Sequence, residues 1–139
     1  MDIERELSAA LLAGRSEAVI ASDARGVIRF WNPGAEHMFG YTAAEAIGQS
    51  LDVIIPEALR KRHWDGYERV MRTGQSRYGA GDVLAVPGQR KDGTRISLEF
   101  TITPLRGADG SLIGMGAVLR DVTARFEELK RLRRQIGQS

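Results

Sequence analysis

Hydrophobic positions along the chain recur with two different periods, which predict where helices and strands lie. Residues 2–13 show the helical period, with an apolar stripe formed by Ile3, Leu7, Ala10 and Leu11. Residues 96–102 instead alternate between apolar and polar, so one strand face carries Ile96, Leu98, Phe100 and Ile102. We therefore expect a chain that combines helices with a sheet that has one buried and one wet face.

Turn and cap residues divide the rest of the chain into short elements. Gly26 closes a tight turn between two β-branched and aromatic runs, which predicts a hairpin. Asn32 followed by Pro33 is typical of a helix start, because the Asn side chain accepts backbone N–H groups and proline is tolerated in the first turn. The predicted order is strands at 18–22 and 27–31, short helices between 33 and 56, a longer helix over 56–71, strands at about 78–86, 96–105 and 114–122, and a last helix from 123.

Composition limits the kinds of protein that fit this pattern. The chain has 139 residues, 42% of them hydrophobic, which is enough for one domain with an ordinary core. Its net charge of +2 comes from interspersed charges, so no nucleic-acid-binding face is expected, and the basic residues 130–134 are interpreted as a solvated helix end. No apolar run reaches the roughly 18 residues of a membrane span, so we expect a cytoplasmic protein without membrane contact.

Motifs for catalysis are missing from the sequence, which argues against an enzyme. There is no G-x-S-x-G elbow or P-loop, and the absence of cysteine excludes thiol nucleophiles, disulfides and cysteine-ligated metals. Asp92 and Asp109 stand in Asp-Gly turns, where aspartate mimics the backbone, so we do not expect an acid–base pair. His37 and His63 stand on separate predicted helices, which argues against a metal site with paired histidines.

Four segments, taken together, resemble the PAS domain family over nearly the whole chain. They are residues 23–32, residues 35–41 with Glu45 and Ile47-Gly48, residues 90–94, and residues 120–123. The resemblance implies an α+β PAS fold, with a five-stranded antiparallel sheet, short helices on one face and flanking helices at both ends. It also implies an N-terminal flanking helix over 1–14, the PAS domain over 15–123 and a C-terminal signalling helix over 124–139.

PAS domains receive signals, so the resemblance implies a ligand or cofactor in a cavity between the sheet and the longer helix. The absence of cysteine excludes the covalent flavin adduct of light-sensing PAS domains and a cysteine-attached chromophore. Residues 62–67 resemble the helix that carries the iron-ligating histidine in haem-binding oxygen sensors, which makes His63 the candidate haem ligand. The candidate pocket residues are His63, Trp64, Tyr67, Leu84, Leu98, Phe100 and Ile102.

The likeness to haem sensors has departures that leave other interpretations open. In those sensors the histidine stands three residues before the helix tyrosine, whereas His63 stands four before Tyr67 and Trp64 takes the matching position. One residue along a helix is a rotation of about 100°, which could turn the imidazole away from the cavity. Leu84 stands where those sensors place an oxygen-binding arginine. The alternative to a haem ligand is that His63 is a partly exposed residue and that Trp64 and Tyr67 have packing roles.

Apolar stripes at the two ends of the chain favour a homodimer. The last helix carries one at Phe126, Leu129 and Ile136, and such stripes commonly mark helix association.

Between the last strand and that helix, Asp121-Val122-Thr123 resembles the junction through which PAS domains signal, with Thr123 as the helix cap and Asp121 at its positive end. We therefore expect a sensor that dimerises through its flanking helices and acts on an unidentified output protein. The alternative is a ligand-free dimerisation or scaffold module.

Overall fold

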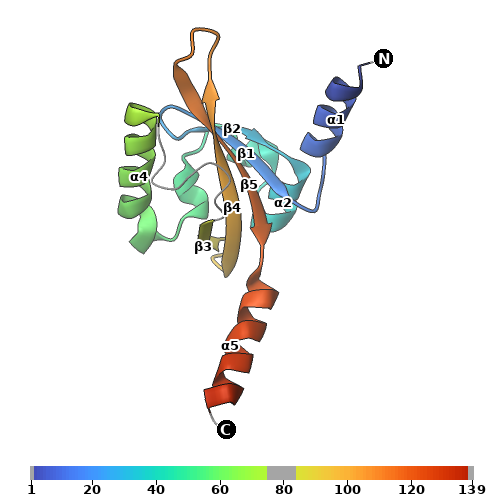
Figure 1. The fold of residues 1–139 in the computed structure, drawn as a ribbon, viewed down its shortest axis with the longest axis vertical. Coiled ribbons are helices and arrows are strands. Elements are labelled where there is room, and N and C mark those ends of the chain that lie inside the picture. Colours follow the sequence, from blue (N-terminus) through green and yellow to red (C-terminus); the bar gives the residue numbers. More distant parts are fainter. Residues whose placement is uncertain (1, 75–83, 138–139) are drawn as a thin grey trace.

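The fold is an antiparallel five-stranded sheet with helices packed on it, which confirms the α+β class. The computed structural model describes residues 2–74 and 84–137. Its elements are α1 (Ile3–Leu12), β1 (Ala18–Asp23), β2 (Ile28–Trp31), α2 (Pro33–Phe39), α3 (Ala43–Ala46), the 3₁₀ turns η1 (Leu51–Ile54) and η2 (Glu57–Leu59), α4 (Arg60–Thr73), β3 (Leu84–Gln89), β4 (Arg95–Arg106), β5 (Leu112–Asp121) and α5 (Thr123–Gly137). The strand order is β2-β1-β5-β4-β3, so β1 pairs directly with β5 (Figure 1).

The longer helix starts later than its sequence predicts. The pattern predicts a start at Pro56, but the chain first makes the 3₁₀ turn η2, which the bond from Leu59 N to Pro56 O closes at 2.9 Å. Helix α4 begins at Arg60 and continues past the predicted end at residue 71 to Thr73, where Gly74 caps it with a left-handed φ of 73°. The third strand reaches Gln89 rather than Val86, because it stays paired with β4. Its predicted residues 78–83 lie outside the described residues.

The core lies between the inner face of the sheet and the short helices. Strand β1 lies where a short apolar run predicts it, and its burial alternates, with Ala18, Ile20 and Ser22 buried. Ile96 and Leu98 of β4 join the same core, and Trp64, Tyr67 and Phe100 pack against it from partly buried positions. The largest apolar side chains in it include Phe39, Ile28, Trp31 and Met38. Burial of these side chains supplies the main favourable contribution to folding.

Asn32 connects three parts of the fold through one buried side chain. Its Oδ1 accepts hydrogen bonds from Val19 N of β1 at 2.8 Å and from Ala35 N of α2 at 2.9 Å. Its Nδ2 donates to Gly14 O at 3.0 Å and to Glu17 O at 3.1 Å, both in the linker after α1. The side chain is 1% exposed, so all its polar capacity is met by protein groups. The predicted N-cap is therefore confirmed, and it also fixes the α1–β1 linker.

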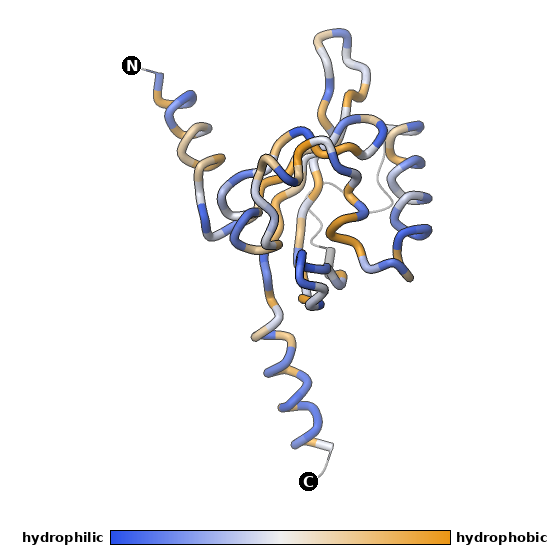
Figure 2. The backbone as a smooth tube through the Cα atoms, turned by 180° about the vertical axis from the view of Figure 1, so that it is seen from behind, coloured by the Kyte–Doolittle hydropathy of each residue, from blue (hydrophilic) through white to orange (hydrophobic). Residues whose placement is uncertain are grey.

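The flanking helices extend away from the sheet at both ends of the chain (Figure 1). Their apolar stripes are exposed, with 71% of Ile3, 63% of Leu11 and 74% of Ile136 accessible to solvent. Figure 2 shows α5 as mostly hydrophilic, with isolated hydrophobic turns along it. Within the described ranges, no helix has the length and apolar character needed to cross a membrane.

Asn32→Ala is expected to lower the free energy of unfolding by about 2–4 kcal/mol, because it leaves buried backbone groups without partners. Urea unfolding measures the loss. Thr42→Ala is the matched control, since Thr42 caps α3 at an exposed position and its loss costs about 1 kcal/mol. Equal losses in the two variants would contradict the role assigned to Asn32.

Candidate functional site

Three ring-bearing residues of α4 form the candidate site. Val70 is the one buried residue of this helix, so its contact with the domain depends on a few larger side chains. The ring centroids of His63 and Trp64 lie 4.7 Å apart, those of Trp64 and Tyr67 5.3 Å, and those of His63 and Tyr67 5.8 Å. Three of the predicted site residues therefore meet in one group, which we call the α4 cluster.

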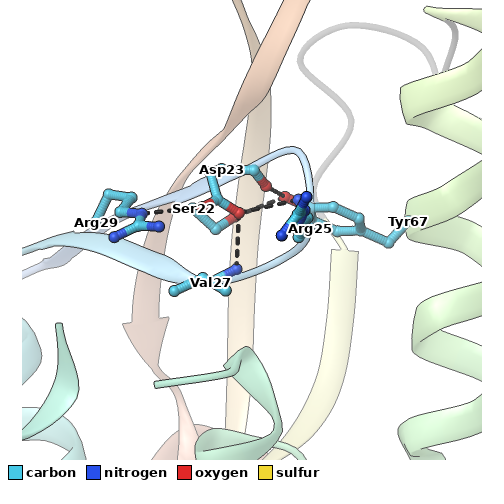
Figure 3. A network of polar contacts seen from close by, with 6 residues as sticks. All are labelled: Ser22, Asp23, Arg25, Val27, Arg29 and Tyr67. Atoms are coloured by element: carbon cyan, nitrogen blue, oxygen red, sulfur yellow. Dashed lines mark hydrogen bonds and ion pairs between the residues drawn. The ribbon is translucent and has the colours of Figure 1, made fainter. Parts of the chain in front are cut away.

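Tyr67 attaches α4 to the end of β1 (Figure 3). Its hydroxyl donates to the backbone oxygen of Asp23 and lies 2.8 Å from Ser22 Oγ. The tyrosine has one hydroxyl proton, so Ser22 donates in the second bond. Burial, with a smaller contribution from the Asp23 carboxylate, raises the pKa of Tyr67 above its usual value. Tyr67 therefore stays neutral at physiological pH and can keep donating to β1.

Asp23 holds the β1–β2 turn to which Tyr67 binds (Figure 3). Its Oδ1 accepts from Arg25 N at 2.9 Å and Val27 N at 3.1 Å, and its Oδ2 forms an ion pair with Arg29 Nε at 2.9 Å. Burial of the carboxylate opposes ionisation, but these hydrogen bonds and the Arg29 charge outweigh it and lower the pKa of Asp23. The turn that receives α4 is thus held by an ionised side chain.

Trp64 packs against the same turn. A Cβ atom added at Gly26 would lie 2.1 Å from the Trp64 ring, and the φ of Gly26 is +80°. Only glycine allows both this backbone conformation and this approach of the ring. The indole Nε1 donates to Asp52 Oδ1 of η1 at 2.7 Å. Trp64 is therefore a packing and anchoring residue in this structure, which matches the alternative interpretation of its role.

His63 carries the unsatisfied polar atom of the cluster. Its Nδ1 is buried and has no hydrogen-bond partner among the described residues. Burial lowers the pKa of His63 below its usual value, while the Asp52 carboxylate opposes the shift more weakly. The imidazole is therefore neutral near pH 7. The rotation of about 100° relative to Trp64 does not carry this ring nitrogen into solvent.

The predicted strand residues divide between the core and less buried positions. Leu98 is 3% exposed and Phe100 packs against the core from a partly buried position. Ile102 is partly buried on β4, where it pairs with Ala117 of β5. Leu84 pairs with Phe100 in the β3–β4 ladder, and its side chain lies outside the described part. Of the predicted strand residues whose side chains are described, Leu98 is therefore part of the core, and Phe100 and Ile102 are only partly buried.

The junction between β5 and α5 is bonded directly to β4. Asp121 Oδ1 accepts from Thr123 N at 3.0 Å and from Thr123 Oγ1 at 2.6 Å. Thr123 Oγ1 in turn accepts from Ser97 N at 2.9 Å, and Val122 N donates to Ser97 O at 2.8 Å. The prediction that Thr123 caps α5 is therefore corrected: Asp121 binds the first helical N–H, and the Thr123 hydroxyl binds β4. An ion pair from Arg125 to Glu99 adds a second link.

Sequence reasoning missed the partners of the α4 cluster, namely Ser22, Asp52 and the backbone of Asp23. One signal was available for Ser22. It occupies an inward position in the alternating strand β1, where a polar side chain requires a buried partner. Asp52 offered no such signal, because the sequence does not show that η1 faces α4.

Comparisons with known proteins match this chain to a protein family. The model of the PAS fold family matches residues 12–127. Sensor protein FixL of Bradyrhizobium diazoefficiens is 33% identical over 121 residues, covering 82% of this chain and 23% of FixL. Oxygen sensor protein DosP of Escherichia coli is 28% identical over 134 residues, covering 96% of this chain and 15% of DosP. This chain therefore spans less than a quarter of either relative.

Solved structures agree on the fold. The crystal structure of a PAS domain from Colwellia psychrerythraea has a TM-score of 0.76 at 22% identity, covering 88% of this chain and 99% of that one. The structure of an RNA-binding light-oxygen-voltage receptor has a TM-score of 0.73 at 22% identity, covering 97% of this chain and 37% of that chain.

Acid is expected to destabilise the domain through His63. Because its folded pKa is lowered, the unfolded chain binds the proton more readily, so stability is present above the usual value of 6.5 and is lost as the pH falls below it. Thermal unfolding at pH 7.5 and pH 5 should show that the melting temperature falls less between these pH values in His63→Gln than in the wild type. His37→Gln, at an exposed position on α2, should behave like the wild type. An unchanged pH dependence in His63→Gln would refute this.

Proposed function

The chain belongs to the PAS family, and we propose that it senses a small ligand or cofactor between α4 and β4 and transmits the change through α5 in a homodimer. PAS domains are sensory modules of signal transduction, and two relatives are sensor proteins. The proposal gives the chain a binding role and no catalytic residue. Its output lies in another protein or another segment.

The observation that carries the proposal is the buried, unpartnered Nδ1 of His63. Leaving a buried polar atom without a hydrogen bond costs about 1–3 kcal/mol, so such an atom needs an explanation. A ligand with a donor group, or a change in the helix that admits one, would satisfy it. The aromatic faces of Trp64 and Tyr67 next to the imidazole supply the apolar surface that small-molecule sites commonly have.

Haem is one cofactor that the site residues fit. A neutral imidazole is the form that ligates haem iron, and burial keeps His63 in that form. His63 would then hold the iron, beside Trp64 and Tyr67 on the same helix. When bound, haem supplies an iron atom at which a gas can bind. This chain contributes the ligating ring, the apolar surroundings and the attachment of α4 to the β1–β2 turn.

The bonds at the β5–α5 junction support this proposed transmission. Ser97 lies between Ile96 and Leu98, whose side chains face the core, and its backbone binds both Thr123 and Val122. A displacement of β4 by a ligand therefore changes the first turn of α5 directly. The ligand must bind the two positions of β4 with different affinities, since only that difference shifts the equilibrium.

Homodimerisation is supported by the exposed stripes on the flanking helices. Leu7 is 56% exposed on α1, and Phe126 and Leu129 are each 46% exposed on α5. A groove of about 340 Å³ between the β3–β4 strands and α5 continues the α5 stripe and includes Val86 and Leu98. Burial of these surfaces against a second copy would remove apolar area from water.

A ligand-free scaffold is the second candidate function. It is favoured by the positions of Trp64, Tyr67 and Phe100, which pack against the buried core and thus occupy space next to α4 with the chain's own atoms. In this alternative the family fold supplies only a dimerisation surface. The two candidates differ in whether the purified protein holds a small molecule.

Binding of a retained or added ligand is expected to depend on His63. Native mass spectrometry of the purified protein should show a mass above that of the chain, either as isolated or after haem is supplied, because the site binds a small molecule. If haem is that ligand, the protein shows a Soret band that disappears in His63→Ala and persists in His37→Ala. No added mass, no Soret band and no thermal shift with haem would leave the scaffold function instead.

Thr123→Val is expected to loosen the contact between β4 and α5, because valine keeps the shape and removes the acceptor for Ser97 N. The free energy of unfolding should fall by about 1 kcal/mol. Hydrogen exchange should accelerate at Ser97 and in the first turn of α5. Thr103→Val, at an exposed position on β4, is the control. Unchanged exchange in α5 would show that this bond does not couple the two elements.

A further inference from the structure

We propose that a cleft at the base of both flanking helices binds a small anion carrying two or more carboxylate or phosphate groups. The cleft has a volume of about 500 Å³, within the range of small-molecule sites. It is formed by the α1–β1 linker, α2, the β3–β4 turn and the end of β5. The lining residues that carry the argument are Arg15, Glu17, His37, Arg90, Arg120 and Asp121.

Positive charge exceeds negative charge in this cleft once the existing contacts are counted. Glu17 forms an ion pair with Arg120 at 3.1 Å, and Asp121 is engaged with Thr123 at the start of α5. In the described ranges, Arg15 and Arg90 form no ion pair. Asp92, whose charge interacts with Arg90, bonds to Thr94 N instead. Two guanidinium groups thus face the cleft with their donors available, and guanidinium binds carboxylate and phosphate in bidentate geometry.

The backbone around these arginines is held in place before any ligand binds. Asn32 Nδ2 bonds Gly14 O and Glu17 O on either side of Arg15, and Gly34 N also donates to Gly14 O at 3.0 Å. Next to Arg90, Lys91 N donates to Phe39 O at the end of α2 at 2.8 Å. A Cβ atom at Gly34 would lie 1.9 Å from Glu17 O, so the linker touches α2 directly. A preorganised frame lowers the entropy cost of binding.

This cleft is separate from the α4 cluster. Helices α2 and α4 lie on opposite sides of the molecule in the view of Figure 1. Asp121 and Val122, which directly precede α5, also line the cleft, so an anion there would lie at the base of that helix. The proposal does not depend on the ligand proposed for α4.

Calorimetric titration with pyrophosphate and with citrate, each against sodium chloride of equal ionic strength, tests the site. Saturable binding of at least one anion is expected, and binding of one alone identifies the preferred group. The double variant Arg15→Gln/Arg90→Gln should bind about tenfold more weakly or not at all, because it loses both available guanidinium groups. Arg25→Gln/Arg62→Gln, at exposed positions away from the cleft, should bind like the wild type.

Three results would overturn the proposal. The first is that neither anion shows saturable binding. The second is that the control variant loses as much affinity as the cleft variant, which would indicate only general attraction to a basic protein. Alternatively, sedimentation without any added anion may show that Arg15→Gln/Arg90→Gln changes the oligomeric state while the control does not. That result would make the cleft a contact between copies of the chain.

Discussion

The hydrogen bonds of Asn32 are the constraint on which the rest of the structure depends. A single amide, 1% exposed, joins β1, the start of α2 and the linker that follows α1. The same bonds hold the backbone on both sides of Arg15, and therefore one wall of the basic cleft. The start of α2, strand β1 and the linker after α1 are thus bonded to one another through one side chain. Satisfying every polar atom of a buried amide leaves few alternative arrangements of these segments.

Helix α4 is held in a different way, and the difference suits a sensory role. It has one buried residue and reaches the domain through Tyr67, which bonds Ser22 and the Asp23 backbone, and Trp64, which bonds Asp52. Elements with few buried apolar contacts open at lower free energy than the core does. A bond from Arg60 Nε to Ile55 O at 3.0 Å adds one more side-chain attachment. A helix held by a few side-chain hydrogen bonds is expected to open at lower free energy than the sheet and α2, and the His63 ring lies next to those of Trp64 and Tyr67.

The two ends of the proposed signalling path meet on β4. Its inward residues Ile96 and Leu98 belong to the core, and Ser97 between them bonds the residues that start α5. A strand has alternate faces, so one segment can contact a core-side ligand and the signalling helix at once. The basic cleft reaches the same junction through Asp121 and Val122. The start of α5 is therefore the place where events at both sites would combine.

The sequence by itself determined the elements that depend only on residues close together in the chain. The Gly26 turn, the Asn32-Pro33 helix start, the alternation of residues 96–102 and the family resemblance all predicted observed structure, because caps, turns and periodicity depend on near neighbours. Only the tertiary structure decided which distant groups meet. Tyr67 reaches Ser22 across 45 residues, and the Thr123 hydroxyl bonds Ser97 rather than capping its own helix. The cleft likewise gathers Arg15, Arg90 and Arg120 from three segments. Such contacts follow from strand order and register, which local patterns do not encode.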